Sequence, residues 1–197
     1  MKKYLFGFAL VLSGLIMSGC AKVPQAEVDG ANAAIELARV AQADVYLSAE
    51  FAAVQDSMNA INAEIETQKS KMFASYGDVK LKLASVTASA TELEGKTAVR
   101  KEEIKNEVNA AIAQLQTLAA ENLALVESAP KGKEGKAAIE AIKGDLSVID
   151  AAAAEIPALL ESGDLLGAQS KANATLEKAN AIKVELTTVV EKYNKKN

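Results

Sequence analysis

The sequence contains no histidine and no tryptophan, and aromatic residues make up only 4% of the chain. Histidine is a frequent transition-metal ligand and general base, so its absence removes the usual basis for both kinds of chemistry. The densest carboxylates, such as Glu64 with Glu66 and Glu102 with Glu103, would need Glu-x-x-His pairs to form a di-metal site in a helical bundle. We therefore predict that the chain is not an enzyme, and we assign no catalytic, cofactor-binding or metal-binding residue.

The chain also has no excess of positive charge, because it contains 22 lysine and arginine residues and 26 aspartate and glutamate residues. The basic residues are interspersed with glutamates and form no cluster of the kind that binds phosphates, so we expect no nucleic-acid partner. Alanine supplies most of the apolar content of 50%. Such a composition favours close helix packing around a thin core over a deep ligand pocket.

A mostly apolar run, interrupted by Gly7, Ser13 and Gly14, stands near the start of the chain, in MKKYLFGFALVLSGLIMSGC. Lys2 and Lys3 form a positive segment, and residues 4–17 form an apolar segment, which is the layout of a secretory signal peptide. The run is shorter than the roughly 20 apolar residues of a transmembrane helix. We predict a signal peptide over residues 1–19, whose removal leaves 20 basic and 26 acidic side chains, a net charge of −6.

The end of this segment, Ile16-Met17-Ser18-Gly19-Cys20, resembles the lipobox cut by the bacterial lipoprotein signal peptidase. The resemblance implies that Cys20 becomes the first mature residue, with a diacylglycerol on its sulfur and a further acyl chain on its amine. Cys20 is the single cysteine of the chain, so a disulfide partner within it is excluded. Because two or three acyl chains make a long-lived anchor, we predict a lipidated N-terminus and short linker over residues 20–25.

The sequence allows two locations for the exported protein, soluble in the periplasm or anchored in a membrane. Gly19-Cys20-Ala21 also satisfies the small-x-small rule of ordinary signal peptidase, whose cut would give a soluble periplasmic protein beginning at Lys22. If Cys20 is acylated, Ala21 stands where an aspartate would retain a lipoprotein in the inner membrane in enterobacteria-like sorting. The resemblance therefore implies an outer-membrane anchor with the protein on the periplasmic side.

The rest of the chain has few helix breakers: only three prolines, at positions 24, 130 and 157, and sparse glycines. Its apolar residues recur at alternating steps of three and four, which is typical of helices that pack along one seam. We predict an all-α fold, an elongated antiparallel helical bundle with long coiled-coil-like helices over residues 26–197. Residues 26–94 are predicted to form its N-terminal helices and residues 98–194 an antiparallel three-helix region.

The boundaries of these helices are predicted from caps and turns. Ser48 is expected to cap a helix that continues to Phe73, and residues 75–78 supply the next turn. Residues 129–135 are predicted to form a hairpin tip, and Asp164 is expected to cap the last helix. The buried seam of the helix after Ser48 is predicted to contain Phe51, Val54, Met58, Ile61, Ile65 and Met72.

Three further features concern the long helices. The seam of residues 78–128 changes phase between Arg100 and Val108, which indicates a stutter or a bend. Pro157 is expected to kink its helix because it lacks a backbone donor. The predicted seams of the last two helices are Ile139, Ile142, Leu146, Ile149, Ala153, Ile156 and Leu160, and then Leu165, Ala168, Ala172, Ala179, Ile182, Leu186, Val189 and Tyr193.

Residues 20–24 and the segments around Ala33-Ala34-Ile35 and residues 51–58 are similar to a family of uncharacterised alanine-rich bacterial lipoproteins, defined by a domain of unknown function. Some members carry an OmpA-like peptidoglycan-binding domain at the C-terminus. Here no βα pattern follows the helices, and Asn197 stands where murein lipoprotein has the terminal lysine that joins peptidoglycan. These differences argue against direct peptidoglycan binding.

The sequence thus leads us to expect a non-enzymatic, lipid-anchored envelope protein that acts as a structural spacer or interaction scaffold in the periplasm. The protein would bind the membrane through its lipid anchor. It would bind a protein partner, or a second copy of itself, through a helical face such as that of Ala111, Ile112 and Ala119. The alternative is a periplasmic chaperone or adaptor that binds peptides or unfolded clients, which requires an exposed apolar concavity larger than a few hundred Å².

Overall fold

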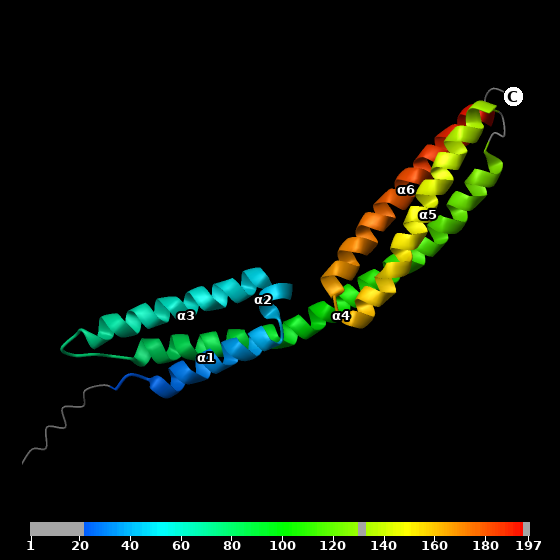
Figure 1. The fold of residues 1–197 in the computed structure, drawn as a ribbon. Helices are drawn as coiled ribbons and strands as arrows, with labels where there is room; N and C mark the ends of the chain where they lie inside the picture. Colours follow the sequence, from blue (N-terminus) through cyan, green and yellow to red (C-terminus); the bar gives the residue numbers. More distant parts are fainter. Residues whose placement is uncertain (1–21, 130–132, 195–197) are drawn as a thin grey trace, which may run out of the picture. The chain divides into compact units, whose positions relative to one another are not determined.

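The computed structural model describes residues 22–129 and 133–194, and within these ranges every regular element is a helix (Figure 1). The prediction of an all-α helical bundle is confirmed. The elements are α1 (Gln25–Val40), α2 (Ala43–Tyr46), α3 (Ser48–Lys69), α4 (Gly77–Ser128), α5 (Lys133–Ser162) and α6 (Leu165–Asn194).

The helices form two compact units, which divide between Glu94 and Gly95. Unit 1 contains α1, α2, α3 and the first part of α4, and unit 2 contains the rest of α4 with α5 and α6. We predicted one bundle with parts at residues 26–94 and 98–194. The boundary between the units falls at the junction of these parts.

Unit 1 is built on an α3–α4 hairpin with α1 packed against it. Lys80 near the start of α4 forms an ion pair of 2.7 Å with Glu27 near the start of α1. Lys82 pairs with Glu64 near the end of α3. Hence α1 and α4 run parallel and α3 runs antiparallel to both, as Figure 1 shows. The cluster that they bury comprises Ala31, Ala34, Ile35, Ala38, Ala43, Phe51, Val54, Met58, Ile61, Ile65, Tyr76, Val79, Leu83, Val86, Ala90 and Leu93.

Two of the predicted boundaries in unit 1 are wrong. Ser48 is the first residue of α3 and not its cap, since the carbonyl of Leu47 accepts the N–H of Phe51 at 2.9 Å. The helix ends at Lys69, four residues before Phe73, and Met72 is exposed instead of buried. The reason is that the chain must cross to α4 early enough to bring Tyr76 into the core, where it is 5% exposed.

Helix α4 is continuous over 52 residues, and its buried positions contain the predicted change of phase. Up to Thr97 they alternate in steps of three and four. Half-buried Arg100 is then followed by buried Ile104 and Val108, which makes two successive steps of four, and the alternation resumes at Ala111. This is a stutter carried by an unbroken helix.

In unit 2, α4 and α6 run parallel. Glu107 accepts a hydrogen bond from Gln169, and Glu121 pairs with Lys183, so both contacts join residues that are 62 positions apart. Helix α5 packs against α6 in the opposite direction. The buried residues of the three helices are Thr97, Ile104, Val108, Ala111, Leu115, Leu118, Asn122, Ile139, Ile142, Leu146, Ile149, Ile156, Leu165, Ala168, Ala172, Thr175, Ala179, Ile182 and Leu186.

The α5–α6 connection follows the predicted pattern. Gly163 adopts a positive φ of 83°, and the N–H of Asp164 donates to the carbonyl of Leu159 at 3.0 Å, which is a Schellman end. The carboxylate of Asp164 then accepts the N–H of Gly167 at 2.9 Å and caps α6.

The predicted hairpin tip over residues 129–135 is only partly described. Helix α4 ends at Ser128 and α5 begins at Lys133, so residues 133–135 are helical and not part of the loop. The remaining loop residues, 130–132, lie outside the described residues. Helix α5 continues through Pro157 for another five residues to Ser162.

Candidate interaction surfaces

The one site residue that the sequence predicts, Cys20, lies outside the described residues. The structure does describe where the chain that follows it is held. Val23 packs against the core of unit 1, Pro24 is buried, and the N–H of Gln25 donates to the carbonyl of Val23 at 2.8 Å. Only residues 21 and 22 therefore separate Cys20 from chain that is packed on unit 1.

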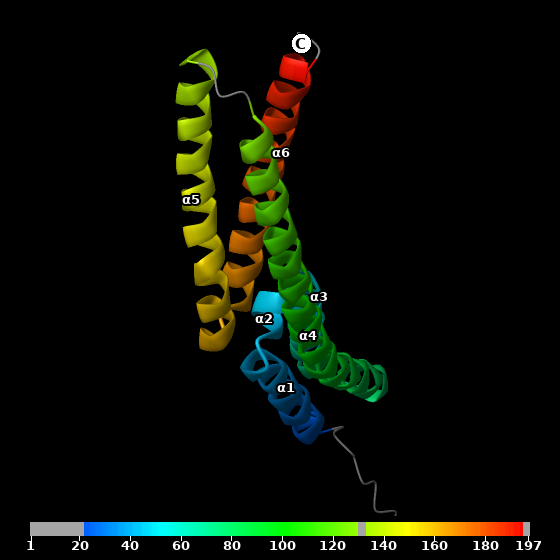
Figure 2. The same cartoon turned by 90° about the vertical axis from the view of Figure 1, so that its right-hand side faces the viewer.

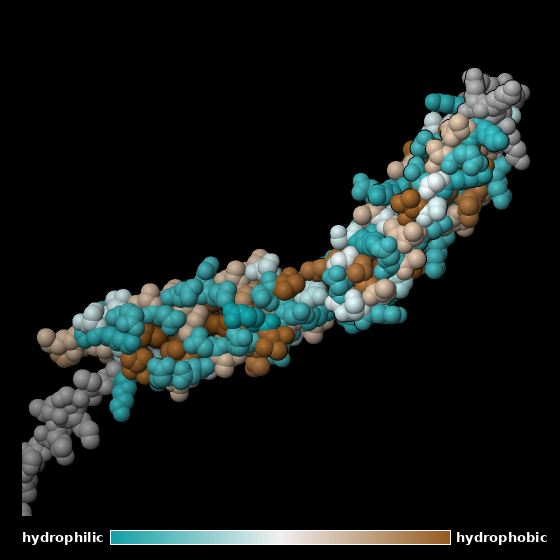
Figure 3. Space-filling view, viewed as in Figure 1, coloured by the Kyte–Doolittle hydropathy of each residue, from teal (hydrophilic) through white to brown (hydrophobic). Residues whose placement is uncertain are grey.

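The α3–α4 turn carries the most exposed large apolar side chains of the described ranges. Met72 is 89% exposed and Phe73 is 87% exposed, and we call this pair the apolar tip. The turn itself is held by Ala74 and Tyr76, which pack on or in the core. In Figure 3 light brown atoms mark this end of unit 1 at the left.

The densest carboxylates lie in exposed ion pairs. Glu66 pairs with Lys69 at 2.7 Å, and Glu102 pairs with Lys105 at 3.1 Å. The hydrogen bond with Glu64 raises the pKa of Lys82. Within the described ranges, no group of three or more aspartate, glutamate, cysteine or histidine side chains could hold a metal ion.

A charged network lies at the stutter of α4. Arg100 donates to Glu107 at 3.0 Å and to Glu103 at 3.2 Å, and these hydrogen bonds, Glu107 first, raise the pKa of the guanidinium. The same contact with Arg100, followed by the hydrogen bond from Gln169, lowers the pKa of Glu107. This network joins α4 to α6 on the surface of unit 2.

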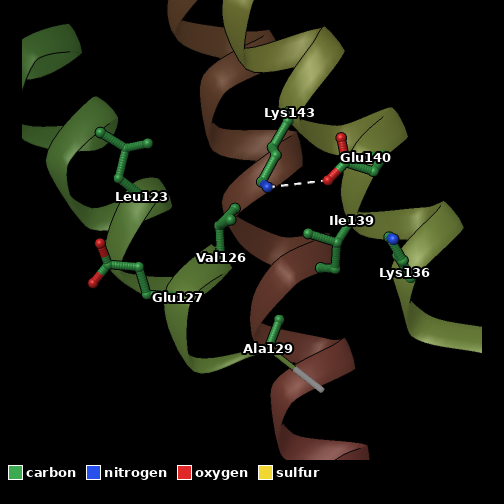
Figure 4. Close-up of a pocket in the computed structure, with 8 residues that line it drawn as sticks. All are labelled: Leu123, Val126, Glu127, Ala129, Lys136, Ile139, Glu140 and Lys143. Atoms are coloured by element: carbon green, nitrogen blue, oxygen red, sulfur yellow. Dashed lines mark hydrogen bonds and ion pairs between the residues drawn. The ribbon is translucent and has the colours of Figure 1, made fainter. Parts of the chain in front are cut away.

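A groove of about 910 Å³ lies between the end of α4 and the start of α5 (Figure 4). The side chains of Val126 and Ile139 point toward one another across it, and the Glu140–Lys143 pair lies beside them. Four apolar and four charged residues line the groove: Leu123, Val126, Ala129 and Ile139, with Glu127, Lys136, Glu140 and Lys143. Its apolar part is therefore small and is mixed with charge.

The helical face predicted for self-association is occupied within unit 2. Ala111 is buried at 6% exposure. Ile112 and Ala119 are half-buried and line a second groove, of about 260 Å³, together with Ile149 and Ala153 of α5. This face of α4 thus lies against α5.

Sequence reasoning missed one buried polar contact. Asn122 is 0% exposed, and its side-chain amide donates to the carbonyl of Ala179 in α6 at 3.1 Å. Its other polar atom, Oδ1, has no hydrogen-bond partner among the residues that the structure describes. The available signal was an asparagine at a seam position, four residues after Leu118.

Comparisons with known proteins add no relative: no family model, no curated protein and no solved structure matches the chain. Among the helices of residues 22–129 and 133–194, none combines the length and the hydropathy needed to cross a bilayer.

Proposed function

We propose that this chain is a non-enzymatic lipoprotein of the bacterial cell envelope, anchored in the outer membrane through acylated Cys20, with its helical units in the periplasm as a spacer or interaction scaffold. The observation that carries the proposal is the lipobox-like segment that ends in the single cysteine of the chain. Membership of the alanine-rich lipoprotein family belongs to the same proposal.

The packing of the linker supports an anchor that holds the protein close to the bilayer. Val23 and Pro24 are fixed on unit 1, so acyl chains at Cys20 would be separated from the unit by two residues only. A flexible tether of two residues reaches roughly 8 Å. Unit 1 would therefore stand directly on the membrane face.

The character of the described surfaces supports a scaffold. The seams are buried within the two units, and exposed ion pairs such as Glu66–Lys69 and Glu102–Lys105 lie on the outer faces of the helices. A long helix with a closed seam offers partners a charged face and little space for a small ligand. Partners would be proteins that meet these helical faces, and nucleic acid is not among them.

The test compares wild type with Cys20→Ala by intact mass and membrane fractionation. A gain in mass from acyl chains at Cys20, lost together with membrane association in the variant, is the expected result. Ala21→Asp is the matched control, because it should keep the acyl mass while the aspartate retains the protein in the inner membrane. An unmodified chain beginning at Lys22 in the soluble periplasm would contradict the proposal.

The second candidate is a periplasmic chaperone or adaptor that binds peptides or unfolded clients, and the groove between α4 and α5 is the described surface on which such a client would bind. Its apolar side chains include Leu123, which is 57% exposed. A chaperone should bind an apolar dye in its native state and suppress client aggregation, and Leu123→Ser should weaken both effects. If neither dye binding nor suppression of aggregation is observed, the chaperone is excluded and the scaffold is the remaining proposal.

A further inference from the structure

The apolar tip is a pair of large side chains that unit 1 does not use. Met72 and Phe73 are 89% and 87% exposed, whereas Met58 and Phe51 of the preceding helix are each 4% exposed. The turn is held by Ala74 and Tyr76, so small polar residues at positions 72 and 73 would serve it equally well. Both apolar side chains are therefore free for a contact outside the unit.

The tip lies at the end of unit 1 where the chain arrives from Cys20. Glu27, in the first turn of α1, pairs with Lys80 in the first turn of α4 at 2.7 Å. Because α4 follows directly on the turn, the start of α1 and the apolar tip share one end of the unit, as Figures 1 and 2 show. Val23, which follows Cys20 by three positions in the sequence, packs against the core of unit 1 just before α1 begins.

The charge around the tip differs from that of the chain as a whole. Residues 67–77 contain Lys69 and Lys71 and no acidic residue, although the complete chain has a net charge of −4. Lys69 pairs with Glu66, and Lys71 forms no ion pair within the part of the chain that the structure describes. An apolar pair flanked by lysines is the composition of segments that enter the headgroup region of a bilayer.

We propose that Met72 and Phe73 insert into the bilayer leaflet that holds the acyl chains of Cys20, with the amines of Lys69 and Lys71 among the lipid headgroups. This inference rests on the proposed acylation of Cys20. The apolar tip is a second membrane contact, and unit 1 meets the bilayer with the end that carries both.

The anchor and the tip support one another. Two apolar side chains bind a membrane weakly, but the short linker keeps them at the surface, where the effective concentration of lipid is high. A protein anchored only by acyl chains on one residue can rotate and tilt freely relative to the bilayer. A second contact at the same end of unit 1 limits this tilt.

The experiment uses the absence of tryptophan from the chain, since Phe73→Trp introduces a single tryptophan at the tip. Val40→Trp is the matched control: Val40 is 73% exposed, and it ends α1, roughly 22 Å along the helix from Gln25. Both acylated full-length variants are reconstituted in vesicles of phosphatidylethanolamine and phosphatidylglycerol. The tryptophan at position 73 should emit at shorter wavelength and be quenched by brominated acyl chains, and that at position 40 should show neither effect.

Two further variants separate insertion from other causes. Met72→Trp should give the same emission shift, because both side chains enter the bilayer. In the Phe73→Trp background, Lys69→Glu with Lys71→Glu should weaken the insertion of the tip by about tenfold or more, since anionic headgroups then repel it. A different result would overturn the inference: an emission wavelength that shifts as the protein density on the vesicles increases, without quenching by brominated lipid. The tip would then contact a second copy of the chain.

Acylation of Cys20 and insertion of the apolar tip are tested separately, because the intact mass of the same preparation shows whether the acyl chains are present. An acylated protein whose tryptophan at position 73 emits as in water would overturn the membrane contact and leave the proposed function standing. A chain without acyl mass would overturn the proposed function itself.

Discussion

Asn122 donates its side-chain amide to the backbone carbonyl of Ala179 at 3.1 Å and thereby joins α4 to α6 inside unit 2. The side chain is fully buried, and its Oδ1 finds no partner within the described ranges. A buried asparagine on a helical seam fixes register at a cost in stability. The contact therefore holds α4 and α6 at one relative height.

Replacing Asn122 by leucine should raise the free energy of unfolding by about 1 to 3 kcal/mol, because the unsatisfied oxygen is replaced by apolar surface. Asn122→Asp should do the opposite, since a buried unpaired carboxylate costs several kcal/mol. Urea titration measures both changes. Asn180→Leu, at an exposed position of α6, is the control and should stay within about 0.5 kcal/mol; a loss of stability in Asn122→Leu would contradict the argument.

Two helical glycines should respond to alanine in different ways. A Cβ at Gly144 would point into open space, so Gly144→Ala should stabilise α5 by about 0.5 to 1 kcal/mol. A Cβ at Gly167 would lie 2.1 Å from the Asp164 carboxylate that caps α6. Gly167→Ala should therefore displace the cap, which is worth about 1 kcal/mol, and cancel the gain in helix propensity.

Thermal unfolding followed by circular dichroism distinguishes the two variants. Asp164→Ala is the control that removes the cap directly. If Gly167→Ala and Gly144→Ala raise the midpoint equally, the carboxylate of Asp164 contributes nothing at the start of α6.

A pH dependence follows from the contact between Arg100 and Glu107. The hydrogen bond from Arg100, and then that from Gln169, lowers the pKa of Glu107 below its ordinary value of 4.5. A carboxyl whose pKa is lower in the folded state contributes stability above its unfolded pKa and loses it as the pH falls through the folded pKa. Hence this contribution should be complete at pH 7, should begin to fall below about pH 4.5, and should be lost as the pH falls through the lower pKa of the folded state.

The measurement is urea unfolding of wild type and Glu107→Gln at pH 7 and at pH 3. The variant should be less stable than wild type at pH 7, and the difference in stability should be smaller at pH 3. High salt should shrink the difference at pH 7 because the pair is exposed. Glu185→Gln, at an exposed position of α6, serves as control, and an equal effect there would refute the role of Arg100.

The seams were predictable because burial on a helix needs only one apolar stripe with the right period. The predicted positions Ile139, Ile142, Leu146, Ile149 and Ile156 are all buried in α5. The stutter was visible for the same reason, since it is a change in that period.

Other features depend on partners distant in sequence. The end of α3 at Lys69 is set by the entry of Tyr76 into the core, and residues 69–73 contain neither glycine nor proline to signal it. The partner of Asn122 is a carbonyl 57 residues away. The proposed acylation of Cys20 would depend on recognition by an enzyme and not on packing, so the helices do not determine it.

Met58 and Met72 provide the most direct comparison between the predicted and the observed end of α3. Both were expected on one buried seam, but Met58 is 4% exposed and Met72 is 89% exposed. Met58→Ala should cost about 2 to 5 kcal/mol, since it removes packed side-chain atoms and leaves a cavity. Met72→Ala should change the free energy of unfolding by less than about 0.5 kcal/mol. Urea unfolding in the absence of membranes decides the matter: equal losses would mean that Met72 is packed in unit 1, and the apolar tip would then have no side chain free for a bilayer.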